Sequence, residues 1–254
     1  ASNNTVGGTT AAARNIIAAS GRSGVEISDL PYGALATTDA AVATESLVSY
    51  GVQRPGEPAV PAAAPTALTA SANGNIIQGN YIGLDASGTQ AFFNVGNGII
   101  IHNGSSNQIG GTAGGAGNVI AGNRGNGILI QAVSGYTATG NLVQGNLIGV
   151  DATGLAMLAN GVNGVAIYNA SYNTIGGTTT DARNVIAGNV GNGVEIGAGE
   201  GGAAEGNLVQ GNLIGLNASG MTLAPNDYSG VMIYDASLNT IGGTEAGAGN
   251  VIAG

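Results

Sequence analysis

The chain has 254 residues, of which 48 are glycine, 43% are hydrophobic and only 7% are charged. Acidic residues outnumber basic ones by 14 to 5, and lysine is absent. Nucleic-acid binding needs a basic stripe that replaces counterions, so this composition argues against it. The negative charge also disfavours anionic polysaccharide substrates. No apolar run reaches the roughly 18 residues of a membrane span, so we expect no membrane insertion. Without cysteine, disulfides and thiolate metal sites are excluded.

A repeat of 66 residues organises the sequence. The segment NTVGG begins at Asn4, and related segments begin at Asn107, Asn173 and Asn239, the last three spaced by 66 residues. The segment NVIAG recurs at the same interval from Asn118. The first copy is longer, which indicates an insertion. A fixed long period is the signature of an array of similar structural units.

Each repeat divides into two coils of three short strands. A strand of the form G-[VI]-x-I is followed by two N-x-[IV] segments. Alternation points Val194 and Ile196 to one side of their strand and Glu195 to the other. Alternate coils contain an extra turn, first seen as LDASGTQAFFN at 84–94. The G-[VI]-x-I strands begin at Gly24, Gly98, Gly127, Gly164, Gly193 and Gly230.

Asparagines recur at the predicted corners, where stacked side-chain amides donate and accept along the stack and fix its register. One ladder comprises Asn107, Asn141, Asn173, Asn207 and Asn239. A second comprises Asn80, Asn118, Asn146, Asn184, Asn212 and Asn250. A third set precedes the G-[VI]-x-I strands at Asn97, Asn126, Asn163 and Asn192. The residue after each asparagine of the second ladder is apolar and points outward, and we expect the extra turns to cover that stripe.

These motifs identify a family resemblance. NTIGGT, GNVIAGN, GNGVEI and GNLVQGNLIG resemble the parallel β-helix repeats of large bacterial secreted and cell-surface proteins, within the pectin-lyase-like superfamily. The resemblance implies an all-β, right-handed parallel β-helix of about six to seven coils, three strands to a coil, and an extracellular or cell-surface location. We expect residues 1–254 to form a single domain of this kind.

Residues 29–72 break the pattern and are interpreted as an insertion within one coil. They contain five of the six prolines and an Ala/Thr-rich stretch. Proline cannot donate to a strand ladder, so a surface loop is expected, with a docking arm as the alternative.

Candidate site residues are few. Tyr168, Tyr234 and Asp235 are predicted to share one face, with the two rings about 10 Å apart, and could bind carbohydrate. Glu26 and Glu195 lie four coils apart, about 19 Å, too far for a catalytic carboxylate pair. Lyases of this fold need an acidic Ca²⁺ cluster and a basic residue, and neither is found on this face. His102, the only histidine, has no evident triad partner.

Two further groups are interpreted as local structure or modification. Asp85, Asp151 and Asn217 occupy equivalent positions in the extra turns and are expected to bond the backbone rather than Ca²⁺. Sequons that could carry glycans outside the cell begin at Asn3, Asn103, Asn169 and Asn217.

We therefore expect a non-catalytic extracellular scaffold, a rod or filament subunit without cofactor or metal. Its partners would be copies of itself stacked head to tail through open solenoid ends, or flanking solenoid coils. Two alternatives remain: a carbohydrate-binding module, and a polysaccharide lyase or hydrolase of the β-helix class with its site in residues 29–72.

Overall fold

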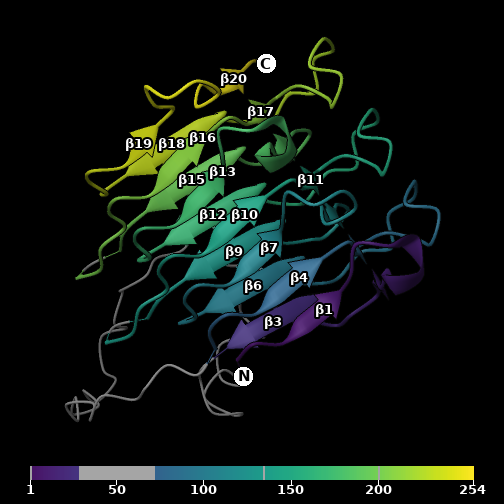
Figure 1. The fold of residues 1–254 in the computed structure, drawn as a ribbon, viewed down its shortest axis with the longest axis horizontal. Helices are drawn as coiled ribbons and strands as arrows, with labels where there is room; N and C mark the ends of the chain where they lie inside the picture. The colour runs from purple at the N-terminus through teal and green to yellow at the C-terminus, as the bar shows by residue number, and fades with distance from the viewer. Residues whose placement is uncertain (1, 29–71, 134, 200) are drawn as a thin grey trace, which may run out of the picture.

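The computed structural model describes residues 2–28, 72–133, 135–199 and 201–254. These residues wind into coils that stack from the N-terminal to the C-terminal end of the chain (Figure 1). Each coil contributes one short strand to each of three parallel sheets. The parallel β-helix predicted from the repeat, with three strands per coil, is confirmed.

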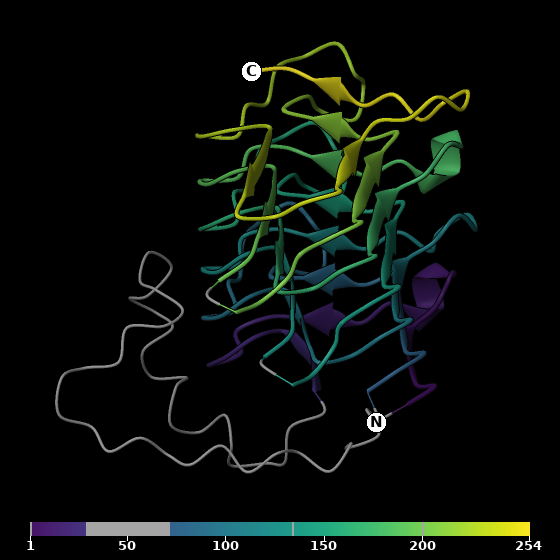
Figure 2. The same ribbon diagram turned by 90° about the vertical axis from the view of Figure 1, so that its left-hand side faces the viewer.

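The three sheets contain seven, seven and six strands. Sheet A consists of β1 (Thr5–Gly7), β4 (Ile76–Gln78), β7 (Gln108–Gly110), β10 (Leu142–Gln144), β13 (Thr174–Gly176), β16 (Leu208–Gln210) and β19 (Thr240–Ile241). Sheet B consists of β2 (Ile16–Ile17), β5 (Tyr81–Ile82), β8 (Val119–Ile120), β11 (Leu147–Ile148), β14 (Val185–Ile186), β17 (Leu213–Ile214) and β20 (Val251–Ile252). Sheet C consists of β3 (Val25–Ser28), β6 (Ile99–His102), β9 (Ile128–Gln131), β12 (Val165–Tyr168), β15 (Val194–Gly197) and β18 (Val231–Tyr234). Two 3₁₀ turns, η1 (Ala11–Ala13) and η2 (Thr180–Ala182), project from the stack on the same side (Figure 2).

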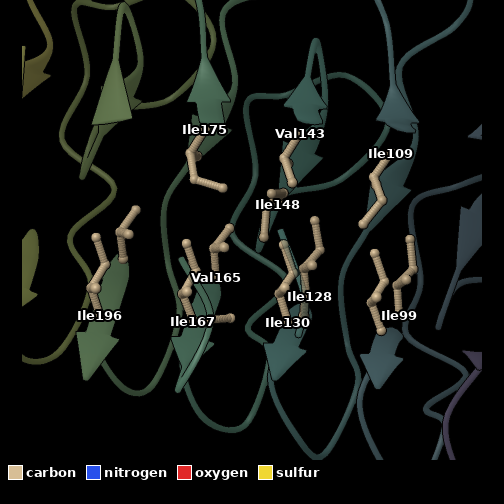
Figure 3. Close-up of a cluster of buried hydrophobic side chains, with 14 of the residues drawn as sticks. Ile99, Ile109, Ile128, Ile130, Val143, Ile148, Val165, Ile167, Ile175 and Ile196 are labelled. Atoms are coloured by element: carbon tan, nitrogen blue, oxygen red, sulfur yellow. The ribbon is translucent and has the colours of Figure 1, made fainter. Parts of the chain in front are cut away.

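The core is a stack of aliphatic side chains inside the coils. Sheet C contributes two inward residues per strand, such as Ile128 and Ile130, and they face single residues of sheet A such as Val143 (Figure 3). All three are fully buried. In parallel register each residue lies about 4.8 Å from its equivalent in the next coil. β-Branched side chains suit this arrangement because they pack well on a pleated surface.

Asparagine ladders hold the corners of the coils. In the first ladder, the Nδ2 of each asparagine donates to the Oδ1 of its equivalent in the next coil, at 2.9–3.1 Å from Asn4 to Asn239. The second ladder runs from Asn15 to Asn250 in the same way, at 2.9–3.0 Å. Both predicted ladders are confirmed, and each extends to the first coil.

The third corner differs from the prediction. Its continuous amide ladder comprises Asn94, Asn123, Asn160, Asn189 and Asn226, at 2.8–2.9 Å. The predicted set, Asn97, Asn126, Asn163 and Asn192, forms a neighbouring column in which a backbone N–H of the later coil donates to the Oδ1 of the earlier one. A side-chain amide bond links only Asn97 and Asn126 within that column. The Nδ2 groups of Asn163 and Asn192 turn to other partners.

The extra turns cover the outward face of sheet B. Residues 84–91, 150–157 and 216–223 form hairpins, each closed by one antiparallel bridge. They pack over the outward apolar stripe, leaving Val119, Val185 and Leu213 5–7% exposed. The expectation that the chain's own turns cover this stripe is confirmed for these three residues, whereas Tyr81 and Leu147 are half-buried and Val251, in the last coil, is 48% exposed. The predicted insertion, residues 29–72, lies outside the described residues except for Ala72, which is buried in the core.

Candidate functional site

The outward face of sheet C carries most of the side chains that the sequence singled out. Because the register is parallel, residues at the fourth position of each strand form one row along the helix axis. The row comprises Ser28, His102, Gln131, Tyr168, Gly197 and Tyr234. Tyr168 and Tyr234 therefore lie two strands apart, in the arrangement that the sequence predicted.

Glu195 lies on the strand between the two tyrosines, and its contacts bear on whether the pair could bind carbohydrate. The hydroxyl of Tyr168 donates to the Oε1 of Glu195 at 2.7 Å, and the Nδ2 of Asn192 donates to its Oε2 at 2.6 Å. A side chain on Gly197 would collide with the ring of Tyr234, so this ring lies across the glycine backbone. The cluster is an internally bonded unit on the surface of sheet C. Asp235, the third predicted residue, is exposed beside it.

The two phenols of this cluster resist ionisation. Burial, followed by the hydrogen bond and negative charge of Glu195, raises the pKa of Tyr168 far above its ordinary value. Burial and the charge of Glu195 also raise the pKa of Tyr234. Neither tyrosine is thus prepared to act as a nucleophile or general base at neutral pH. The geometry favours a structural role for the pair.

The remaining residues that could take part in catalysis either lie far apart or already contact a neighbouring side chain. Glu26 and Glu195 lie on β3 and β15, four strands apart in sheet C, as the sequence indicated. His102 is 7% exposed, and its Nδ1 lies 2.7 Å from the Nε2 of Gln131 on the neighbouring strand. Gln131 thus occupies the histidine's position in the next coil, where a triad would need an acid or a nucleophile.

The acidic residues of the hairpins stabilise their own turns. The Oδ1 of Asp151 accepts hydrogen bonds from the hydroxyl of Thr153 and from the N–H groups of Leu155 and Ala156. Asp85 has the equivalent bonds to Ser87, Thr89 and Gln90. No group of three or more His, Asp or Glu side chains that could hold a metal ion occurs among the described residues. The interpretation of these positions as local turns agrees with the structure.

The four sequons differ in accessibility. Asn3 is exposed, and Asn169 is half-buried. Asn103 is fully buried, and its Oδ1 accepts a hydrogen bond from the N–H of Val133. Asn217 is 5% exposed. A glycan on Asn103 or Asn217 would therefore require local opening of the coil, which disfavours the predicted modification at both positions.

A scan against protein-family models and searches of curated proteins and of solved structures found no match. No helix in the described part of the chain is long and apolar enough to cross a membrane.

A pocket that the sequence did not reveal lies where the chain passes from sheet C to sheet A. Its volume is about 410 Å³, and its described lining includes residues 132–133, 135–139 and 201–203 of two corners. Asn169, Ser171 and Tyr172 of the intervening corner also line it. The sequence feature that could have revealed this pocket is a difference in corner length. Ten residues separate β9 from β10, whereas five separate β12 from β13.

Proposed function

We propose that this chain is a non-catalytic scaffold, a rod or filament segment of the kind found in extracellular and cell-surface proteins of the pectin-lyase-like superfamily. The observation that carries the proposal is the asparagine ladder system. Three amide ladders run through successive coils, and Tyr168, a predicted carbohydrate-binding residue, bonds to Glu195 within the same surface. A solenoid built this way gives length and a regular surface from one small repeat.

The last coil presents a surface that fits another coil. Ile233, Ile241 and Ile252 occupy inward positions and are 38–49% exposed. Their equivalents one coil earlier, Ile196, Val209 and Ile214, are fully buried. Full burial of an exposed side chain of this size is worth about 1.5–3 kcal/mol, so covering the part of each that remains exposed is worth roughly half of that. A further coil would cover them, whether it came from flanking sequence or from a second copy of this chain.

The ladders give this stacking a direction. In each of the first two, the amide of the earlier coil donates to the carbonyl oxygen of the later one, as in the pair Asn207 and Asn239. By the same geometry Asn239 and Asn250 direct N–H donors toward the next coil. Asn4 and Asn15 direct acceptor oxygens toward the coil before them. Head-to-tail contact pairs donors with acceptors, whereas contact between like ends would oppose identical groups.

The strand count sets one condition on such contact. Sheets A and B have seven strands and sheet C has six, so copies stacked in simple continuation lack one strand of sheet C at the junction. Successive copies must therefore rotate, or another segment must supply the strand. The insertion, residues 29–72, is our candidate for that segment.

Sedimentation velocity over a range of concentrations tests the proposal. We expect elongated oligomers that grow with concentration, and a shift to monomer in Ile241→Asp, which places a charge on the end surface. Thr222→Asp, in an exposed hairpin, is the matched control and should sediment like the parent chain. A chain that stays monomeric at every concentration, or an equal response to both substitutions, would overturn head-to-tail stacking.

A further inference from the structure

The pocket at the corner between sheets C and A arises from the alternation of the coils. The corners after β9 and β15 are long and project outward, and the short corner after β12 lies between them. Two successive coil spacings of about 4.8 Å separate the long corners. The slot is open to solvent, and Tyr136 and Tyr172 are among the residues that line it.

The described residues that line this slot are uncharged, and they form an amphipathic surface. Its side chains are small apolar groups, two tyrosine rings, and the hydroxyl or amide groups of Thr137, Thr139, Asn169 and Ser171. The hydroxyls of Thr139 and Ser171 already bond to neighbouring corners. Within the described chain, the Nδ2 of Asn169 and the hydroxyls of Tyr136, Thr137 and Tyr172 have no hydrogen bond. The slot thus combines apolar rings with polar groups that are available to a ligand.

Tyr172 is held in a strained backbone conformation. Its φ is 58°, and the equivalent positions in the adjacent coils are glycines, Gly140 at 66° and Gly206 at 63°. A large side chain is uncommon in this left-handed region. The ring of Tyr172 lies against Gly206, where a Cβ would come within 2.6 Å of it. Although packed there, the side chain remains 64% exposed at the mouth of the slot.

We propose that this slot binds a sugar ring of a neutral polysaccharide. A pyranose has an apolar C–H face that suits a tyrosine ring and hydroxyls that suit the amide of Asn169 and the hydroxyl of Thr137. The pocket volume lies within the 300–1,000 Å³ typical of small-ligand sites. The chain's net charge of −9, and the lack of a cationic side chain among the described lining residues, select against acidic glycans. The opening to solvent lets a polysaccharide chain continue beyond the bound ring.

Binding of neutral hexasaccharides, measured by isothermal titration calorimetry and by tyrosine fluorescence, tests this site. The chain has eight tyrosines and no tryptophan, so tyrosine emission is observable directly. The probes are the hexaoses of glucose, mannose, galactose and xylose, with hexagalacturonate as the acidic counterpart. We expect at least one neutral probe to bind and hexagalacturonate not to bind.

The decisive variants are Tyr136→Ala and Tyr172→Asn, each expected to weaken binding at least tenfold. Asparagine suits the backbone because Asn3 occupies the equivalent position with a φ of 56°. Leu238→Ala, at the equivalent exposed position two coils later, is the control and should bind normally. Thermal melts verify that each variant folds. Failure of every neutral probe, preference for hexagalacturonate, or unchanged binding by both tyrosine variants would overturn the proposal.

Discussion

The Nδ2 of Asn184 donates to the Oδ1 of Asn212 at 2.9 Å, and the backbone N–H of Asn184 donates to the same oxygen at 3.2 Å. The amide of Asn184 also donates to the carbonyl oxygen of Val143. Its own Oδ1 accepts two hydrogen bonds from Asn146. One buried side chain thus joins three successive coils at a single corner.

Replacing the side chain of Asn184 should break these hydrogen bonds between coils. Asn184→Leu leaves buried donors and acceptors of both neighbouring coils without partners, so we expect a loss of about 1–3 kcal/mol in the free energy of unfolding. Thr179→Ala is the control, because Thr179 is exposed and its side chain makes no capping bond at η2. Chemical denaturation measures both. Equal effects of the two substitutions would refute the claim that the asparagine ladder stabilises the fold.

A glycine corner gives a second prediction. Gly176 ends β13 with a φ of 91°, and a Cβ there would collide with the carbonyl oxygen of Gln210. Gly176→Ala should therefore destabilise the chain by more than about 1–2 kcal/mol, the cost of left-handed backbone alone. Gly114→Ala has open space around the new Cβ and no positive φ, so its melting temperature should change little. A normal melt for Gly176→Ala would contradict the packing described for this corner.

The raised pKa of Tyr168 predicts a pH dependence at the alkaline end. Its contribution to stability is complete below the ordinary tyrosine pKa of about 10 and is lost as pH rises from there toward the folded value, because the unfolded chain ionises first. Tyr168→Phe should reduce the fall in unfolding free energy above pH 10. It should also cost about 1 kcal/mol at pH 7 by removing the bond to Glu195.

Tyr228→Phe is the control for this titration, since Tyr228 is 76% exposed. Absorbance of tyrosinate near 295 nm follows ionisation in the folded state. Loss of a phenol that ionises at or below the ordinary tyrosine pKa on Tyr168→Phe substitution would contradict the arrangement around Glu195, which predicts ionisation at higher pH.

The hairpins provide a test in which the repeat supplies its own control. Asn217 stands where the other two hairpins have Asp85 and Asp151, and its Oδ1 accepts bonds within its turn from Ser219. Asp151→Asn should therefore be tolerated. Asp151→Ala should cost about 1 kcal/mol and increase hydrogen exchange at Leu155 and Ala156.

Acid should weaken the same turn. Burial opposes ionisation of Asp151, but the bonds from Thr153, Ala156 and Leu155 outweigh it and lower its pKa. Its contribution is thus present above the ordinary aspartate pKa of about 3.9 and is lost as pH falls below it. Exchange rates at pH 3 that match those at pH 6, after correction for intrinsic rates, would contradict this account.

Sequence reasoning predicted the coils because their causes are local and repeated. Each N-x-[IV] segment specifies a corner amide and an inward side chain, and the 66-residue period aligns the copies. It missed the ladder at Asn94, Asn123, Asn160, Asn189 and Asn226 because each of the first four members lies three residues before the asparagine chosen instead.

Contacts between coils were harder to foresee. The alternation of the strand predicted that Tyr168 and Tyr234 share a face, but not that Glu195 would engage the hydroxyl of Tyr168. Extra length was assigned to the hairpins alone, so the long corners that form the slot beside Tyr172 went unrecognised. Side-chain bonding across coils depends on rotamers and corner lengths, which a repeat pattern does not encode.

Imaging of the purified 254-residue chain tests the central claim, a scaffold of stacked coils, most directly. Seven coils at about 4.8 Å give one copy a height of roughly 34 Å. The account predicts rods that are multiples of this height, with diffraction near 4.8 Å along the rod axis. Compact single particles at every concentration, or assemblies whose strand spacing runs across the long axis, would contradict it.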